Sequence, residues 1–357
     1  MSSLDAEWDA FLEGGEIAVH DPVKTMPSHS VKSGSPKCSD IYISTKTKIA
    51  YLRSQINLKE VFWGIPIIGY SDPVEGVVKK QMKFISHSQD ELDNMRANLA
   101  PYENVDELVL SHLDNPGGRI KFKDVRKVSL GLCKKDILSY RCKQKSAFYN
   151  CFVLIFRVKH EDTFWEVHVK VFNTGKLEIP GIKCDRLLEK VLDLVSAECD
   201  RFVPGITWSP ETETVLINSN FSCGFYINRA KLNSIIQQKY QIACVYDPCS
   251  YPGIQCKFYY DSSLDKQTGS IGTTTDTALL KKISFMIFRT GSVLIVGKCD
   301  ETELRVIYEF LCSMLETEYH HINEEPSDSS MVTPKVTKCK KERKKTITVT
   351  KSSVEAI

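Results

Sequence analysis

The feature that most constrains the fold is an internal repeat, in which two segments about 116 residues apart share one pattern. The first, VFNTGKLEIPGIKCDRLLEKVLDLV, begins at Val171, and the second, IFRTGSVLIVGKCDETELRVIYEFL, begins at Ile287. Each contains an alternating strand that ends in Phe, a tight Thr-Gly turn, a second alternating strand, and Cys-Asp before an apolar stripe with helical spacing. Each segment therefore predicts a β-hairpin followed by a helix, and the chain is expected to have two similar halves.

Other local signals place further elements around the repeat. Asp185 and Asp300 are predicted helix N-caps, and Glu303 has the capping-box spacing from Asp300. Short helices are expected at about 57–63 and 229–240. The remaining strands are expected at IYISTKTKIAYLRSQI, AFYNCFVLIFRVK, TVLINSNFSCGFYI and YPGIQCKFYY. An insertion at about 70–123 interrupts the first half, with an expected strand at GVVKKQMKFIS and a helix capped by Ser88.

Length and composition narrow the class of protein. A chain of 357 residues with 42% hydrophobic residues can bury a core, and its length suggests two globular units. No window resembles a bilayer-spanning helix, and the acidic start does not resemble a signal peptide, so we expect a soluble, unsecreted protein. The 13 cysteines show no CxxC pattern, which predicts reduced packing thiols and neither a metal site nor a cofactor.

Charge is unevenly distributed along the chain. Residues 71–118 contain nine acidic and four basic residues, whereas residues 119–145 contain ten basic and two acidic residues. The two blocks are either solvated faces that attract each other, or the second is a polyanion-binding band. The C-terminal KCKKERKK is either a nuclear address, a loose nucleic-acid contact or an aid to solubility.

Several phrases of the sequence resemble the TATA-binding protein family. YDPCSYPGIQCKFYY and KISFMIFRTGSVLIVGK in the second half are similar to that family's Pro-Gly stretch and second hairpin. In the first half, GVVKKQMKF, KDVRKVSLGLCKKDILSYR, AFYNCF and EVHVKVFNTGKLEIPGI are similar to the TATA-binding-protein-like proteins of nucleocytoplasmic large DNA viruses. The resemblance covers about residues 39–322. It implies an α+β fold, a saddle of two pseudo-symmetric repeats with a curved antiparallel sheet and helices on its convex face, and no enzymatic activity.

The resemblance also implies a division of the chain. Residues 1–38 are expected to be a flexible acidic segment, and residues 39–203 the first repeat with its insertion at about 70–123. Residues 204–322 are expected to be the second repeat, and residues 323–357 a disordered basic tail.

Alternation along the strands predicts which face each residue occupies. In the first half Val167, Val169 and Val171 should meet the helix, which leaves Phe172 on the polar face. In the second half both faces are apolar, because the residues opposite to the helix-facing ones are themselves apolar: Met286, Phe288, Leu294 and Val296. That face is expected either to form an exposed apolar patch or to be covered by another element.

The resemblance gives these residues roles in DNA binding. Minor-groove architectural proteins, the TATA-binding protein among them, insert apolar wedges between base steps and kink the duplex. The wedge pair of the second half falls on Tyr251 and Phe288, whereas in the first half Phe172 has Cys151 as its partner.

Polar residues complete the expected surface. The resemblance places Arg157 and Lys257 at phosphate-contacting positions and Asn218 at the minor-groove amide, with Thr45 at the matching position of the first half. Glu178 would bring a carboxylate to the same surface, which is unfavourable next to phosphates. For the aromatic, basic and amide residues, the alternative interpretation is ordinary packing, solvated charge or a turn.

Two functions remain open at this point. The first is a transcription-initiation factor that binds double-stranded promoter DNA in the minor groove and recruits a factor IIB-like protein and RNA polymerase. The second is a protein-interaction scaffold of a viral transcription complex with weak or no specific DNA binding, which Glu178 and Cys151 favour. Neither function involves a membrane or a small-molecule substrate. The expected location is intracellular, in a cytoplasmic viral factory, the host nucleus or the virion.

Overall fold

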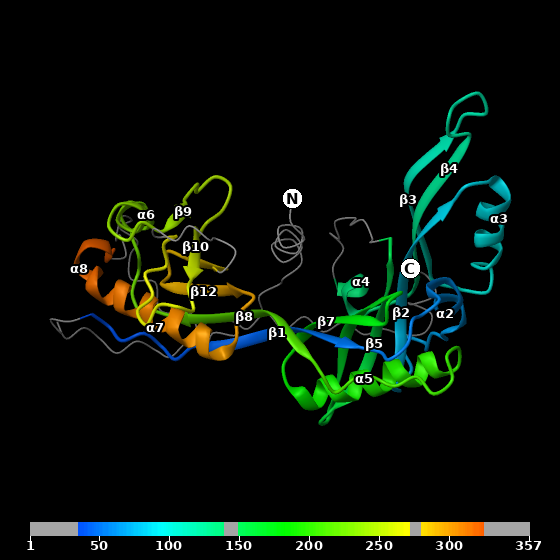
Figure 1. Cartoon of the computed structure of the whole chain (residues 1–357), viewed down its shortest axis with the longest axis horizontal. Coiled ribbons are helices and arrows are strands. Elements are labelled where there is room, and N and C mark those ends of the chain that lie inside the picture. The colour runs from blue at the N-terminus through cyan, green and yellow to red at the C-terminus, as the bar shows by residue number, and fades with distance from the viewer. Residues whose placement is uncertain (1–34, 139–148, 272–279, 325–357) are drawn as a thin grey trace, which may run out of the picture. The chain divides into compact units, whose positions relative to one another are not determined.

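The computed structural model describes residues 35–138, 149–271 and 280–324. The strands among these residues form one 12-stranded sheet in the order β3-β4-β2-β5-β6-β7-β1-β8-β12-β11-β10-β9, and all neighbouring strands are antiparallel (Figure 1). Helices accompany the sheet, so the α+β class expected from the sequence is confirmed. The acidic N-terminal segment and nearly all of the basic tail lie outside the described residues.

The strands are β1 (Tyr42–Tyr51), β2 (Gly76–Ser86), β3 (Val105–Asp114), β4 (Phe122–Gly131), β5 (Cys151–His160), β6 (Thr163–Phe172), β7 (Lys176–Ile182), β8 (Glu213–Ser222), β9 (Ala243–Val245), β10 (Ile254–Tyr260), β11 (Lys281–Ile287) and β12 (Ser292–Gly297). The helices are α2 (Leu58–Gly64), α3 (Gln89–Ala97), α4 (Lys134–Leu138), α5 (Asp185–Asp200), α6 (Arg229–Gln238), α7 (Glu301–Thr317) and α8 (Tyr319–Ile322).

The two hairpin-and-helix units predicted from the repeat are present. The first consists of β6, β7 and α5, and the second of β11, β12 and α7. The pair β1–β8 joins the two halves, and from it the sheet continues through β7, β6, β5 and β2 on one side and through β12, β11, β10 and β9 on the other. The strand order is thus alike in both directions, while the predicted saddle of symmetric repeats stays a prediction.

Side-chain caps mark most of the helix starts. Asn57, Ser88 and Asn228 accept hydrogen bonds from backbone N–H groups three residues on, and Asp300 forms a complete capping box with Glu303. The prediction that Asp185 is an N-cap is wrong. Cys184 occupies that position without a side-chain hydrogen bond, and Asp185 is the first helical residue. Its carboxylate lies 3.3 Å from the Lys48 ammonium instead.

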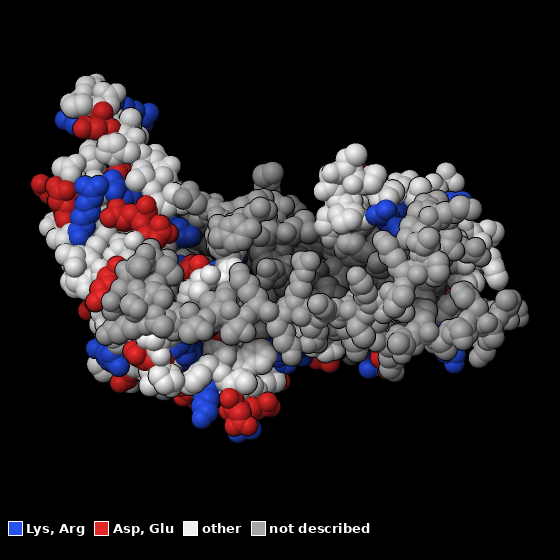
Figure 2. All heavy atoms as spheres, turned by 180° about the vertical axis from the view of Figure 1, so that it is seen from behind, with Lys and Arg blue, Asp and Glu red and all other residues white. Residues whose placement is uncertain are grey.

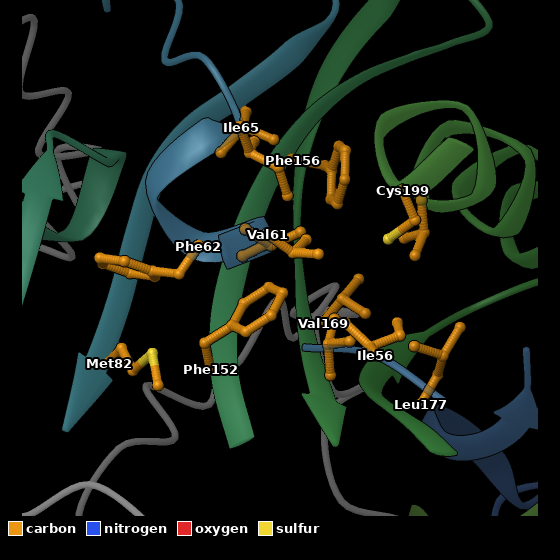
Figure 3. Packing of buried hydrophobic residues seen from close by; sticks show 14 of the residues in the cluster. Ile56, Val61, Phe62, Ile65, Met82, Phe152, Phe156, Val169, Leu177 and Cys199 are labelled. Carbon is orange, nitrogen blue, oxygen red and sulfur yellow. The ribbon is translucent and has the colours of Figure 1, made fainter. Parts of the chain in front are cut away.

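Each half has its own hydrophobic core between the sheet and its helices. In the first half, Val167, Val169 and Val171 are buried against α5, as their alternation predicts. Figure 3 shows Val61 and Phe62 of α2 packed toward the strand residues of this core. The second core joins α6 and α7 to the sheet through Leu232, Ile236, Leu304, Ile307, Leu311, Ile283, Phe285, Ile287, Val293 and Ile295.

A buried lysine closes the C-terminal end of α2. Lys80 on β2 is fully buried, and its ammonium donates hydrogen bonds to the carbonyls of Phe62 at 2.6 Å and Ile65 at 2.7 Å. The Tyr102 hydroxyl lies 3.1 Å from the same nitrogen. Burial lowers the pKa of Lys80 to about 8, because these neutral acceptors replace only part of its hydration.

The insertion forms a larger extension of the sheet than the sequence predicted. The expected strand and helix are present as β2 and α3. The sequence reading missed the hairpin of β3 and β4, and β4 continues past residue 123 to Gly131. In Figure 1 this hairpin leads away from β2 with α3 nearby. The hairpin makes β3 one edge of the whole sheet, and β9 is the other edge.

Candidate nucleic-acid interface

Most of the predicted contact residues of the second half lie on one face of the sheet, opposite to α6 and α7. Strand register aligns Lys257 with Ser284, Ser284 with Val296, Val296 with Asn218, and Asn218 with Thr45. This series, which we call the central row, crosses five strands. In the neighbouring row Met286 of β11 lies opposite Leu294 of β12. Residues of alternate parity belong to the helix-side core, so the two rows share the other face.

An aromatic pair lies next to these rows. The rings of Tyr251 and Phe288 have centroids 5.9 Å apart and are tilted by 59°. Tyr251 lies in the turn before β10, and Phe288 follows β11. Gly253 fits between them, since a Cβ there would come within 3.0 Å of the Tyr251 ring and 3.1 Å of the Phe288 ring. The structure thus brings together the two residues predicted as a wedge pair, and both are partly exposed.

The expectation of an exposed apolar patch is wrong for this structure. Met286, Leu294 and Val296 are 0%, 8% and 3% exposed, respectively. One covering contact comes from Tyr251, whose hydroxyl lies 3.6 Å from the Met286 sulfur. This cover also desolvates the phenol and raises the pKa of Tyr251. The apolar residues therefore become available to a ligand only if their cover moves.

Asn218 has one satisfied and one unsatisfied end. Its Nδ2 donates to the Thr45 hydroxyl at 3.1 Å, while its Oδ1 is buried with no hydrogen-bond partner among the described residues. Because a hydroxyl can donate as well as accept, the amide can turn over without losing the Thr45 contact. In that orientation the NH2 group is the free end. Asn218 and Thr45, which the sequence predicted to match each other, are thus in direct contact at the junction of the two halves.

Lys257, the predicted phosphate contact of the second half, also lies on this face. Its ammonium donates to the Ser284 hydroxyl at 2.6 Å, and its side chain is partly exposed. The sequence reading did not identify Ser284, although its strand parity with Met286 would have placed it on the same face.

The corresponding face of the first half has a different character. Phe172 lies directly opposite Cys151 in the β5–β6 register, where the second half has two rings in contact. Cys151 is buried, and this desolvation raises its pKa to about 11. The Lys176 ammonium lies 5.6 Å from the Phe172 ring centroid, within cation–π range. Phe172 therefore has a cation and a thiol as neighbours, and no aromatic partner.

Charge on this face is neutralised internally. Glu178 of β7 lies opposite Lys170 of β6, and their charged groups are 2.5 Å apart. The Glu178 side chain is only 13% exposed. The carboxylate that the sequence placed on this surface thus forms an ion pair with a residue of the same surface.

The prediction that Arg157 is a strand residue free to contact phosphate does not fit its surroundings. Arg157 is 8% exposed, and its guanidinium donates to the carbonyls of Asp72 at 2.5 Å and Tyr70 at 2.6 Å. Its charge also lies 4.9 Å from the Tyr70 ring centroid. The loop before β2 therefore occupies the group that was expected to contact DNA.

Helix α4 covers another part of the same face. Asp136 of α4 accepts hydrogen bonds from the Lys79 ammonium at 2.8 Å, which helps to keep the pKa of Asp136 below its usual value although burial opposes this. Glu166 accepts two hydrogen bonds of 2.9 Å from the backbone N–H of Lys134, and burial raises the pKa of Glu166. Sequence reasoning found none of these contacts, since they join segments that are distant in sequence.

The acidic and basic blocks partly neutralise each other. Arg126 of the basic block contacts Glu107 of the acidic block at 2.7 Å and Asp124 at 2.7 Å. Figure 2 shows red acidic and blue basic side chains side by side at upper left, where the view places the end of the sheet with β3 and β4. For Arg126 this supports mutual attraction of the two blocks. Residues 139–145 of the basic block lie outside the described residues.

Two further searches concern the described residues only. None of their helices has the length and apolar character of a membrane span. No group of three or more His, Cys, Asp or Glu side chains in that part of the chain is arranged to hold a metal ion.

Comparisons with known proteins give one structural likeness. No family model matches the sequence, and no curated protein matches it. Among solved structures, TBP from Methanococcus jannaschii matches this chain with a TM-score of 0.40 and 14% sequence identity. The match covers 78% of this chain and 99% of that chain. A likeness of this degree carries no argument about function.

Proposed function

We propose that this chain is a TATA-binding-protein-like transcription initiation factor that binds the minor groove of promoter DNA, mainly through its second half. The observation that carries the proposal is the convergence of sequence-predicted contact residues on one sheet face: Tyr251, Phe288, Lys257, Asn218, Met286, Leu294 and Val296. They come from four strands and two adjacent turns. A face with apolar, aromatic, amide and cationic groups in this order fits a groove with an apolar floor and anionic walls.

Each group has a physical role in this proposal. Phe288 and Tyr251 supply a ring pair at the end of the strands, suited to entering an opened base step. Asn218 supplies an amide donor, and the minor groove at A·T pairs presents only acceptors. Lys257 supplies a charge for a phosphate. DNA binding requires the cover over Met286 to move, which removes a contact of the Tyr251 phenol.

The resemblance of the sequence supports finer parts of the proposal. We place the chain in the viral branch of the family, with two pseudo-symmetric repeats forming a saddle, a curved sheet and helices on its convex face. It would recruit a factor IIB-like protein and RNA polymerase and catalyse no reaction. The place of action would be a cytoplasmic viral factory, the host nucleus or the virion.

The scaffold function remains the second candidate because of one observation. The first-half face is occupied by the chain's own residues, with Arg157 held by carbonyls and Glu178 paired with Lys170. A protein that used both halves on DNA would need these groups to be available. If the second half also fails to bind DNA, the conserved use of the sheet is protein contact.

The test measures binding of labelled AT-rich and GC-rich duplexes to the full chain at low and high salt. Because binding through phosphates releases counterions, the affinity should fall steeply as salt rises. Asn218→Ala should reduce the preference for the AT-rich duplex, because the lost amide is a minor-groove donor. Asn220→Ala is the matched control, since Asn220 lies on the same strand two residues away and donates to Ser44 at 2.8 Å.

The outcomes separate the two candidate functions. Salt-dependent binding with an AT preference that Asn218→Ala diminishes supports the initiation factor. Absence of binding to either duplex at low salt rejects it in favour of the scaffold. Equal effects of the two asparagine variants would show that Asn218 has no special role in the groove.

A further inference from the structure

The two edges of the 12-stranded sheet differ in length. At one edge, β9 has only three residues, whereas β3 at the other edge has ten. Among the described residues, β3 pairs with β4 on one side and with no strand on the other. The outward backbone N–H and C=O groups of β3 are therefore a template on which another strand can be added. Such a template at β9 is too short for more than a few hydrogen bonds.

The residues of β3 do not protect this edge. Natural edge strands are commonly protected by lysine, proline or shortness, but β3 reads VDELVLSHLD and has neither lysine nor proline. Its ladder has a single irregularity, between Val109 and Ser111. Three of its apolar side chains are substantially exposed: Val105 at 38%, Val109 at 48% and Leu113 at 39%. The edge is long, apolar and open along its length.

A hollow lies beside this edge. It has a volume of about 420 Å³ and is formed between α3 and the β3–β4 hairpin. Leu92 and Val109 provide its apolar lining, and Gln89, Arg96, His112 and Arg126 provide polar lining. In strand addition, main-chain hydrogen bonds supply affinity and pockets accept alternate side chains. The hollow is placed to accept an apolar side chain of an added strand.

Charge at the edge indicates the kind of partner. Residues 103–114 include Glu103, Asp106, Glu107 and Asp114 and no lysine or arginine. Of these acids, Glu107 has an ion pair with Arg126. Pairing of β3 with β3 of a second copy would bring two acidic strands together, which is unfavourable. A segment with lysine or arginine between its apolar residues would instead meet complementary charge.

We propose that β3 is a docking edge for a partner protein, which adds an extended segment of alternating apolar and basic residues to the sheet. The added strand forms main-chain hydrogen bonds with β3 and places one apolar side chain in the hollow beside α3. The inference is independent of the proposed DNA contact, which lies on the second half of the sheet. It gives the insertion a role as an interaction surface.

The test uses the full chain and a labelled synthetic peptide of alternating lysine and valine. Fluorescence anisotropy measures affinity, and amide hydrogen exchange locates the bound peptide. We expect saturable binding and slowed exchange in β3. Val109→Lys should weaken binding by about 10-fold or more, which corresponds to loss of one central interface contact. Val245→Lys on β9 is the matched control and should leave affinity unchanged, as Val245 is 65% exposed on the other edge.

Further arms keep the outcomes distinct. Asp106→Asn tests the charge without altering side-chain size, and should weaken binding even if Val109→Lys proves unfolded by its melting curve. A peptide of alternating glutamate and valine, and a lysine–valine peptide interrupted by proline, should not bind. Equal binding of either peptide, protection outside β3, or unchanged affinity in both variants would overturn the proposal. A dimer of the free chain that Val109→Lys abolishes would also overturn it, because the edge would then pair with itself.

Discussion

The two halves of the sheet have similar strand order and similar helix-side cores, but their opposite faces differ. In the second half that face carries Tyr251 and Phe288 in ring contact, an apolar row and Asn218 with an unsatisfied atom. In the first half the face carries the Lys170–Glu178 ion pair and a loop that holds Arg157. Helix-side packing is required for folding in both halves, whereas the other face is free to diverge. The comparison indicates that the halves share a structural role and have separated in function.

The largest expected effect tests whether the cores are equivalent. Phe156 on β5 and Phe285 on β11 are both fully buried, so replacing either with alanine should cost about 3–5 kcal/mol of unfolding free energy. Because β1 and β8 join the halves in one sheet, either variant should shift a single unfolding transition, measured by urea titration with circular dichroism. Two separate transitions, with only one shifted by each variant, would show that the halves fold independently.

The next prediction contrasts the aromatic residues of the two faces. Phe288→Ala should weaken DNA binding by about 10-fold or more, as loss of a central aromatic contact does, whereas Phe172→Ala should have a smaller effect. Anisotropy with an AT-rich duplex measures affinity, and energy transfer between duplex ends measures bending. Melting curves of both variants control for folding. Equal losses of affinity would break the comparison between the faces.

The third prediction concerns the pH dependence of stability, which should differ between residues of the two halves. Lys80 has a pKa of about 8 in the folded protein and 10.5 as its ordinary value, so the unfolded chain binds more protons between these values. Stability should therefore rise as pH increases from about 8 to 10.5. Lys80→Met should lack this rise. Urea unfolding across that pH range measures it, and an identical slope in the variant would contradict the origin of the effect.

Glu318 in the second half provides the opposite case. Burial opposes its ionisation, but hydrogen bonds from Lys239 and Tyr240 outweigh this and lower its pKa below 4.5. Its contribution to stability is thus present above its ordinary pKa and is lost as pH falls through the lower, folded value. Lys239→Met should make unfolding less sensitive to acid in this range. An unchanged acid transition would show that the ion pair does not control this titration.

The smallest expected effect tests the charge on the first-half face. Glu178→Gln leaves Lys170 without its ion-pair partner, and it removes a carboxylate from a surface where DNA would bring phosphates. If DNA reaches this face, affinity should rise by less than about 1 kcal/mol at low salt, and the gain should shrink as salt screens the charges. Glu301→Gln is the control, because Glu301 is an exposed helix residue paired with Lys46. No gain at low salt would confine the DNA to the second half.

Local patterns predicted the parts of the fold that depend on neighbouring residues. Alternation placed Val167, Val169 and Val171 on the buried side, and the Asp300 capping box marked the start of α7. The same patterns misplaced the cap of α5, where Asp185 and Cys184 are adjacent and an Asp at either position is compatible with a helix start. They also missed β3, since VDELVLSHLD does not alternate cleanly around its irregularity at Val109.

The candidate site was predictable only in part. Alignment of the two halves correctly paired Asn218 with Thr45 and Tyr251 with Phe288, because strand register follows from hairpin geometry. It did not show that Arg157 binds the carbonyls of the loop before β2. Contacts between residues 85 or more positions apart leave no periodic signal in the sequence.

The sequence by itself determined which segments become strands and helices, and which side chains of each strand share a face, because both follow from the period of apolar residues. Only the tertiary structure decided which of those faces remains usable. It buried Met286, placed α4 and a loop over the first half, and left β3 open at the edge. The physical reason is that cover and exposure depend on which distant segments pack together, and many arrangements are compatible with the same local pattern.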